Sequence, residues 1–356
     1  MLFRDIAKQR LINQHLVGTK FTTPQQMVSY FGAIQAQDYP MAKWAIGLRL
    51  AASEASVEDA INNGSILRTH ILRPTWHFIS ATDIHWMLTL TAPHVKASMA
   101  SLARQLGLDA QVSKRCNTII EKSLSGGQHL TREELMQALN KKGIVTSGFR
   151  SMLIMMNAEL EGIVCNGYRR GKQFTYSLLP PKSPTSKTFT KEEALAELAT
   201  RYFTSHGPAT LKDFCWWSGL SVTNAGLAIE SIRSTFHSQI IENNTYWFAG
   251  IQEAADKIKK HIVFLPAFDE FLVSYKDRSA SIDPAAIKTT ITNNGIFRPV
   301  IVVNGQVIGV WKRTIKNDTV TIETHFFNEI AKSQKQQIFK AAKQFGDFLE
   351  LKTIIQ

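Results

Sequence analysis

The sequence predicts an α+β protein in which tandem helical modules, each closed by a β-hairpin, are followed by a small C-terminal β-barrel or curled sheet and a terminal helix. The order helix, turn, helix, hairpin occurs twice, on either side of the Pro- and Ser-rich segment 180–187. Beyond Lys257 apolar strand-like segments dominate, and Asn304-Gly305 joins two of them, the strongest short-range signal for a hairpin. A chain of 356 residues is long enough for two to four modules.

The first 125 residues are the least regular part of the sequence. Helices are expected over about 4–17 and 24–31, and a hairpin is expected around Arg73 and Pro74. These elements permit a further, elaborated copy of the helical module, so we expect an N-terminal module over 1–125.

A second module is expected over 126–180. A Thr-x-x-Glu capping box at 131–134 starts a short helix, and a second helix is expected over 147–162. Two apolar strands within 163–178 are joined by a glycine-containing basic turn. Helix, turn, helix and hairpin in this order indicate a winged helix.

A third module is expected over 188–255, and a C-terminal module over 256–356. The third repeats the winged-helix order and closes with a hairpin turn at Asn243-Asn244. The C-terminal module is expected to hold strands and then a final helix, with these ranges: 262–265, 300–303, 307–311, 320–324 and the helix 328–348.

The charge balance favours a nucleic-acid binder. Lys and Arg outnumber Asp and Glu by 41 to 29, a net charge of +12, which is the electrostatic pattern of proteins that bind polyanions. Residues 1–180 hold 20 basic against 12 acidic side chains, and the remainder holds 21 against 17. The first half is therefore the expected DNA-facing part.

Other classes of protein are disfavoured by composition. No apolar run reaches the length of about 20 residues that spans a bilayer, and the first ten residues do not resemble a secretion signal. We expect a cytoplasmic protein associated with the nucleoid through DNA. Three cysteines about 50 residues apart, without a CxxC pair, fit neither a disulfide framework nor a zinc site, so no metal and no cofactor are expected.

The candidate active site is the segment 31–40, in which Gln35 and Gln37 alternate with small or apolar residues. Alternation directs both amides to the same side only where the chain is extended. A pair of solvent-facing glutamines before the proline at position 40 is the alternative interpretation, and the residues alone leave both open.

Four segments together resemble the AlkZ-type winged-helix DNA glycosylases. They are Gln35-Ala36-Gln37, residues 67–79 (LRTHILRPTWHFI), residues 264–278 (FLPAFDEFLVSYKDR) and residues 305–312 (GQVIGVWK). The resemblance covers nearly the whole chain in order. It implies tandem winged helices with a C-terminal β-barrel, and a Gln-x-Gln motif used for activity. Pro74 stands where the family is expected to have glycine, which questions the backbone path of that hairpin.

The chemistry implied by the resemblance suits two amides. An N7-alkylated purine is cationic, so its glycosidic bond is already weakened and the base leaves without a general acid. The protein must place a water against C1′ and stabilise an oxocarbenium-like sugar, largely by positioning and fixed dipoles. A glutamine carbonyl can accept a hydrogen bond from the water, and its amide can hold a phosphate or sugar oxygen.

Carboxylates near the matching segments have two interpretations each. Asp38 is the rival for activating water, unless it caps or pairs locally. Asp269 is expected in a structural ion pair, with support of catalysis as the alternative.

DNA contacts are expected from two hairpins. Arg68, Arg73 and His77 would grip phosphates, and Trp76 either wedges against a base step or packs in the core. At the tip of the second module's hairpin, phosphate contacts are expected from three residues: Arg169, Arg170 and Lys172.

The predicted function is a monofunctional, metal-independent glycosylase that removes N7-alkylated purines from double-stranded DNA, with interstrand crosslinks as a further substrate. It is expected to act as a monomer without an obligate protein partner. The alternative is a non-catalytic winged-helix regulator that reads DNA with its recognition helices.

Overall fold

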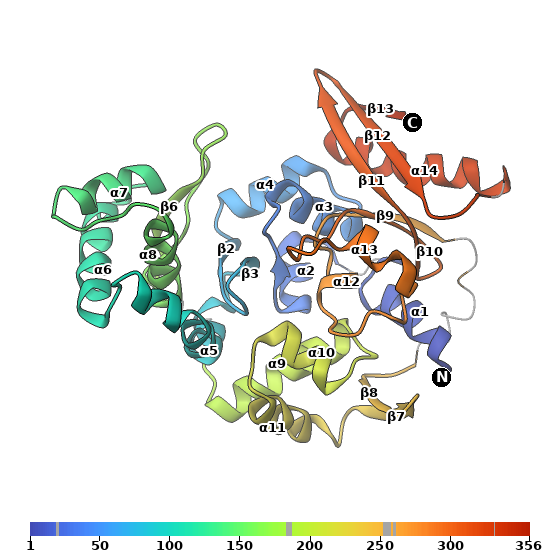
Figure 1. The fold of residues 1–356 in the computed structure, drawn as a ribbon, viewed down its shortest axis with the longest axis horizontal. Helices are drawn as coiled ribbons and strands as arrows, with labels where there is room; N and C mark the ends of the chain where they lie inside the picture. Colours follow the sequence, from blue (N-terminus) through green and yellow to red (C-terminus); the bar gives the residue numbers. More distant parts are fainter. Residues whose placement is uncertain (19–20, 183–186, 252–257, 259–260, 331) are drawn as a thin grey trace.

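The computed structural model describes residues 1–356 except 19–20, 183–186, 252–257, 259–260 and 331. The fold is mixed α+β, and in Figure 1 the α5–α8 lobe stands apart from a larger body that contains both termini. Half of the expected linker 180–187 lies outside the described residues. None of the helices among the described residues has the length and hydrophobicity needed to cross a membrane.

The N-terminal region places a small antiparallel sheet against helices. The sheet has the order β1-β3-β2, and β2 and β3 form the hairpin expected around Arg73 and Pro74. The region contains α1 (Phe3–Asn13), α2 (Pro24–Phe31), β1 (Ile34–Gln35), α3 (Tyr39–Leu50), α4 (Glu54–Asn62), β2 (Ile66–His70) and β3 (Trp76–Ser80).

The second region follows a 22-residue helix, α5. Its strands form the sheet β4-β6-β5, and Thr131 and Glu134 make the predicted capping box. The elements are α5 (Ile84–Gln105), α6 (Ala110–Leu124), β4 (Leu130–Thr131), α7 (Arg132–Asn140), α8 (Phe149–Leu160), β5 (Val164–Asn166) and β6 (Thr175–Leu178).

The third region repeats this order below the first (Figure 1). The turn of its hairpin is formed by Glu242 and Asn243, which both have positive φ, so the predicted Asn243-Asn244 turn is displaced by one residue. The elements are α9 (Lys191–Ser205), α10 (Leu211–Ser218), α11 (Val222–Ile232), β7 (His237–Ile241) and β8 (Asn244–Phe248).

The C-terminal region is an open curled sheet of order β13-β12-β11-β10-β9. Strands β13 and β9 are edge strands, so this curled sheet does not close into a barrel. Asn304 and Gly305 form the predicted turn, both with positive φ. The elements are β9 (Ile262–Leu265), α12 (Glu270–Val273), η2 (Pro284–Ala286), α13 (Ile287–Thr290), β10 (Val300–Val303), β11 (Gln306–Lys316), β12 (Thr319–Phe326), α14 (Lys332–Leu349) and β13 (Lys352–Ile355).

The N- and C-terminal regions share hydrophobic cores. Trp44 of α3 packs on the rings of Phe345 and Phe348 in α14, and its indole N–H donates to the carbonyl of Phe264, 2.9 Å away. Leu11 of α1 lies in one core with strands β9 and β10. Apolar side chains of the expected modules 1–125 and 256–356 therefore pack together in common cores.

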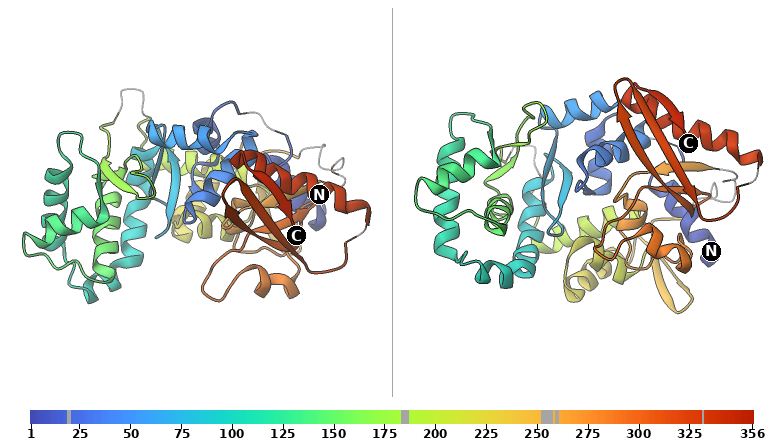
Figure 2. Two further views of the ribbon diagram at one scale, coloured as in Figure 1. Left: turned by 90° about the horizontal axis from the view of Figure 1, so that it is seen from above. Right: turned by 45° about the horizontal axis from the view of Figure 1, so that its top comes forward.

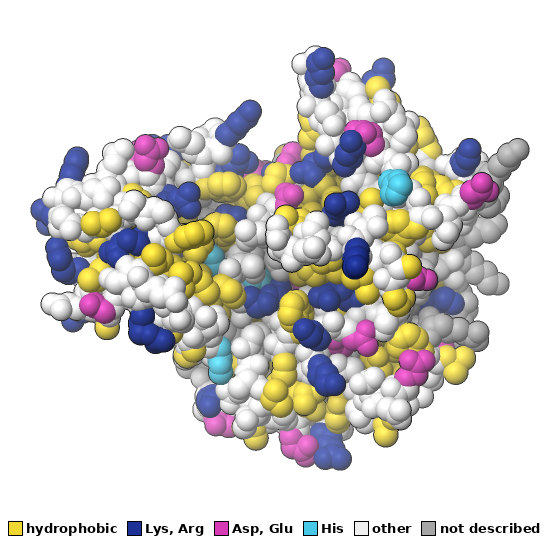
Figure 3. All heavy atoms as spheres, in the orientation of Figure 1, with side chains coloured by type: hydrophobic (Ala, Val, Ile, Leu, Met, Phe, Trp, Pro, Cys, Tyr) yellow, Lys and Arg dark blue, Asp and Glu magenta, His cyan; other side chains and the backbone are white. Residues whose placement is uncertain are grey.

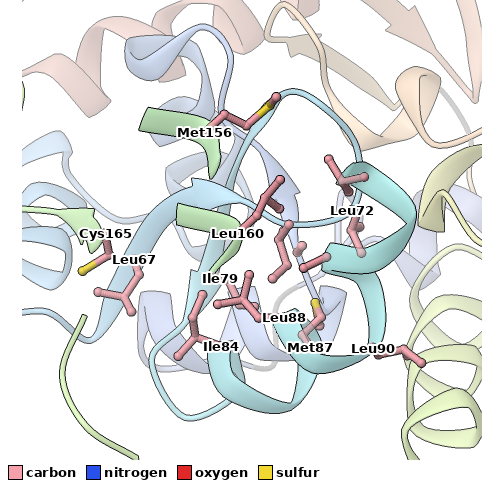
Figure 4. Packing of buried hydrophobic residues seen from close by; sticks show 14 of the residues in the cluster. Leu67, Leu72, Ile79, Ile84, Met87, Leu88, Leu90, Met156, Leu160 and Cys165 are labelled. Carbon is pink, nitrogen blue, oxygen red and sulfur yellow. The ribbon is translucent and has the colours of Figure 1, made fainter. Parts of the chain in front are cut away.

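The second region docks onto the β2–β3 hairpin. Leu67 and Ile79 of the hairpin pack with Leu160 of α8 and with α5 in one continuous core (Figure 4). The buried carboxylate of Glu159 in α8 accepts a hydrogen bond of 2.8 Å from the backbone N–H of His70. Helix α6 packs in this core together with α5.

Candidate active site and nucleic-acid interface

The backbone of the Gln-x-Gln motif is extended at its first half. Gln35 pairs with His77 in the β1–β3 ladder, and the next N–H, of Ala36, donates to the carbonyl of Trp76 at 2.7 Å. The Ala36 carbonyl in turn accepts from Nε of Arg68 at 3.1 Å. Both polar groups of the Ala36 backbone are thus held by the β2–β3 hairpin.

Gln35 is held at its backbone and at its side chain. Its N–H donates to Oε1 of Glu270 at 2.6 Å, and its side-chain carbonyl accepts from Nη2 of Arg73 at 2.7 Å. Arg73 also donates to the carbonyls of Trp216 and Trp217 in α10. The first glutamine is therefore preorganised by three regions of the chain.

Glu270 is a buried anion behind Gln35. Burial alone raises the pKa of its carboxyl, but His206, Arg73 and the Ser274 hydroxyl outweigh that effect and lower the pKa to about 2. Ser274 donates to Oε2 of Glu270, and Nε2 of His206 lies 3.5 Å from the same oxygen. The carboxylate is consequently charged at neutral pH.

Gln37 and Asp38 lie at the surface, after the strand. The side chain of Gln37 is exposed and hydrogen bonds to no other described residue. Asp38 caps α3 by accepting from the Met41 N–H at 3.2 Å, and its Oδ1 lies 3.9 Å from Arg313 of β11. The local capping role expected as the alternative for Asp38 is present in the structure.

A stack of cations and rings joins the motif to the hairpin tip between β5 and β6. The Arg68 guanidinium lies 4.4 Å from the Trp76 ring and 4.9 Å from the Phe174 ring. Arg169 lies 5.3 Å from the rings of Phe174 and Tyr39. Trp76 is half-buried, because Arg68 and His70 cover parts of its ring. Its position is therefore between the two that we expected, a wedge exposed to DNA and a residue buried in the core.

The three basic residues between β5 and β6 differ in whether they are paired within the protein. Arg170 pairs with Glu134, whose pKa this bond lowers to about 2, while Arg169 is drawn into the ring stack. Lys172 is exposed at the end of the turn. Lys172 is the best placed of the three for a phosphate contact.

The predicted phosphate contact of His77 is wrong, and Arg73 uses its donors within the protein. His77 is fully buried, and burial, reinforced by the charge of Arg73, lowers its pKa to about 3, so it is a neutral core residue. Arg73 directs its hydrogen bonds to Gln35 and to two carbonyls of α10. Arg73 therefore organises the protein, as Arg68 does through Ala36.

Asp269 is a structural residue. Its two oxygens accept from the Arg49 guanidinium at 2.8 and 2.9 Å, both side chains are 1% exposed, and Oδ1 also caps α12 at the Phe271 N–H. The structural ion pair expected for Asp269 is therefore present. Its neighbour Glu270, which sequence reasoning passed over, is the residue that reaches the motif.

The β11–β12 hairpin is a second feature that sequence reasoning missed as a DNA-facing element. It projects from the body in Figures 1 and 2, and Lys312 and Lys316 are exposed along it. Through Arg313 and Asp38 it reaches the segment beside Gln37. The available signal was a group of three basic residues, Lys312, Arg313 and Lys316.

The motif therefore lies between two projecting hairpins. The β5–β6 tip contacts Tyr39 through Phe174, and β11 contacts Asp38. Figure 3 shows the surface hollowed between the two lobes, with Lys and Arg side chains on both sides. Among the described residues no three His, Cys, Asp or Glu side chains are grouped as metal ligands.

Comparison with known families assigns this α+β chain to the DNA glycosylase class. Residues 28–348 match the family model described as DNA glycosylase AlkZ-like. The chain therefore belongs to the AlkZ-like DNA glycosylase family.

Two comparisons with individual proteins agree with this assignment. The sequence is 24% identical, over 334 residues and 87% of each chain, to the interstrand DNA cross-link repair glycosylase of Streptomyces sahachiroi. The fold is similar to the solved structure of Streptomyces sahachiroi DNA glycosylase AlkZ, with a TM-score of 0.81, 21% identity and complete coverage of both chains. The structural likeness shows the fold.

Proposed function

We propose that this protein is a monofunctional glycosylase that hydrolyses the N-glycosidic bond of N7-alkylated, cationic purines in double-stranded DNA, including purines in interstrand crosslinks. Gln35 and Gln37 carry the reaction, and no metal or cofactor takes part. The protein acts as a monomer. Similarity to an interstrand DNA cross-link repair glycosylase supports the extension to crosslinks.

The observation that carries the proposal is the clamped segment 35–36, which lies between two hairpins that carry basic side chains. Four hydrogen bonds hold the backbone of residues 35 and 36 and the side chain of Gln35. The side chain of Gln37 is exposed next to this segment. Neutral amides cannot protonate a leaving base. They suffice when the base carries its own positive charge, because the glycosidic electrons then flow to a cation.

DNA binding is assigned to the hairpins and to the second region, which we interpret as a winged helix over about 110–180. Its order α6, β4, α7, α8, β5, β6 is that of a winged helix, with Lys172 at the wing. The region of α9–α11 with β7 and β8 repeats it. Phosphate contacts from both hairpins would straddle the motif.

The alternative, a regulator that reads the major groove, is disfavoured by the third helix of each module. Seven of the twelve residues of α8 are buried, because this helix packs against α5 and the β2–β3 hairpin. The exposed side of α11 carries apolar Val222 and Leu227, and its Arg233 pairs with Glu230. Neither helix offers the basic, accessible face that base readout needs.

The test is base release from a duplex with one N7-methylguanine, followed by alkaline cleavage of the abasic site. Duplexes crosslinked through two guanine N7 atoms and duplexes containing uracil complete the set. We expect release from both cationic substrates and none from uracil. Absence of release from every N7 adduct would refute the function, and tight binding to one palindrome without release would favour the regulator.

Alanine variants assign the reaction to the motif. Gln35→Ala and Gln37→Ala should each lower the single-turnover rate while the affinity for DNA changes less than threefold. Equal losses in affinity and rate would instead place the glutamines in DNA binding.

A further inference from the structure

The side-chain amide of Gln35 has a fixed orientation. Arg73 lies 2.7 Å from one end of this amide, and a guanidinium can only donate hydrogen bonds. The end that faces Arg73 must therefore be the carbonyl oxygen. The Nε2 end then points away from Arg73, and among the described residues it has no hydrogen-bond partner.

Gln35 can consequently offer substrate a free donor, whereas its carbonyl oxygen already accepts one hydrogen bond from Arg73 and keeps a single lone pair. The residue is only 6% exposed, and its backbone N–H is bound to Glu270. The Gln35 carbonyl is therefore the poorer acceptor for an attacking water, because a second hydrogen bond would have to form beside the Arg73 guanidinium.

Gln37 differs in each of these respects. Its side chain is exposed, and neither its carbonyl nor its amide nitrogen bonds to another described residue. It can turn its carbonyl toward a water in the hollow. The two residues share a residue type, while their surroundings allow different chemistry.

We propose that the two glutamines have unequal roles. Gln35 holds a substrate acceptor oxygen through the N–H of its side-chain amide, and Gln37 accepts the hydrogen bond that orients the attacking water. Arg73 and Glu270 are the positioning residues that impose this division, Arg73 on the side chain and Glu270 on the backbone. The proposal rests on the proposed function.

The reaction balances without a protein base. The water oxygen forms the bond to C1′, and the bond from C1′ to N9 breaks with its electron pair passing to the cationic base. The base leaves neutral, and the new hydroxyl at C1′ loses its extra proton to solvent, while the Gln37 carbonyl only accepts a hydrogen bond from the water. The role of Gln35 is to hold a sugar or phosphate oxygen while charge develops at C1′.

One chemical change made at two positions tests the division. Gln35→Glu removes the donor and leaves a carboxylate that pairs with Arg73, whereas Gln37→Glu keeps an acceptor at the same place. At pH 8 on N7-methylguanine duplex we expect Gln35→Glu to lower the single-turnover rate about 100-fold, the loss typical of one preorganised donor. Gln37→Glu should stay within tenfold of the natural protein. The reverse order of rates would overturn the proposal.

A second pair of variants tests whether Arg73 acts through Gln35. Gln35→Met keeps the shape of the side chain without donor or acceptor, and Arg73→Met removes the guanidinium. Because effects on one interaction are not additive, the double variant should be no more than twofold slower than Gln35→Met alone. Multiplied losses would show that Arg73 acts independently, which would refute its positioning role.

Glu270 is tested against a matched buried carboxylate. Glu270→Gln keeps the shape and loses the charge, and we expect the maximal rate to fall about tenfold with unchanged DNA affinity. Asp213, also 1% exposed, accepts from the N–H groups of Lys276 and Asp277, so Asp213→Asn should lower the melting temperature and leave the rate within twofold. Equal rates for both variants would refute the role of Glu270. Failure of the natural protein to release any N7-alkylated base would instead remove the proposed function itself.

Discussion

Replacing Asp269 tests whether this carboxylate serves stability or catalysis. Asp269→Ala strands the Arg49 guanidinium, which is 1% exposed and loses hydrogen bonds of 2.8 and 2.9 Å. Removing one partner of a buried ion pair costs about 3–5 kcal/mol, and loss of the cap of α12 adds about 1 kcal/mol. The free energy of unfolding should therefore fall by about 4–6 kcal/mol, a large part of the stability of a domain.

Urea unfolding, followed by tryptophan fluorescence, measures this loss, with Asp283→Ala as the matched control. Asp283 caps η2 by accepting from the Ala285 N–H at 2.8 Å, but it is exposed and should cost only about 1 kcal/mol. Equal losses for the two variants would refute the reasoning from the buried pair. Asp269→Asn, assayed in conditions where it is folded, should release N7-methylguanine within threefold of the natural rate, and a hundredfold loss would return Asp269 to the catalytic machinery.

Three further predictions concern packing, acid sensitivity and DNA affinity. A Cβ on Gly47 would lie 2.3 Å from the Phe348 ring, so Gly47→Ala should destabilise the protein by about 1–3 kcal/mol; thermal melting at the natural midpoint would contradict the close contact. His77 is buried with its pKa lowered to about 3, so only the unfolded state takes up its proton below about 6.5, and the free energy of unfolding falls with decreasing pH by at most about 1.4 kcal/mol per unit. His77→Phe should lack this part of the slope between pH 6.5 and 4.5 in urea titrations, and unchanged slopes would place His77 in contact with water. Lys172→Ala should weaken DNA binding and reduce the salt dependence of log K by about 0.9, measured by fluorescence anisotropy at several salt concentrations; an unchanged slope would remove Lys172 from the phosphate contacts.

Local signals predicted the local structure well. The Thr131–Glu134 capping box, the helix over 24–31 and the Asn304-Gly305 turn appear where the sequence indicates. Each depends on contacts within a few residues, which a linear pattern records. Helix α3 was missed because most of its side chains are buried, whereas α4 and α6 have N-caps at Ser53 and Asp109 and one apolar side, signals that the prediction passed over.

The site was predicted only in its first residue layer. Gln35 and Gln37 follow from family resemblance. Glu270 accepts a hydrogen bond from the Gln35 N–H, but the two residues are 235 positions apart in the sequence. No pattern within the segment 264–278 distinguishes the adjacent carboxylates, of which Asp269 binds Arg49 and Glu270 binds Gln35. The distinction arises from which side of α12 faces the motif, and that is set by tertiary packing.

The charges around Gln35 also explain why a buried anion accompanies a motif of neutral amides. A cationic base and a developing oxocarbenium ion are opposed by any nearby uncompensated cation, and Arg73 brings one into contact with Gln35. Coulombic interactions weaken only slowly with distance in a buried setting, so orientation by Arg73 alone would raise the barrier that it is meant to lower. Glu270, charged and placed at the backbone of the same residue, offsets that cation. The site thereby obtains a rigid amide donor at almost no net charge, which suits a substrate that arrives positively charged.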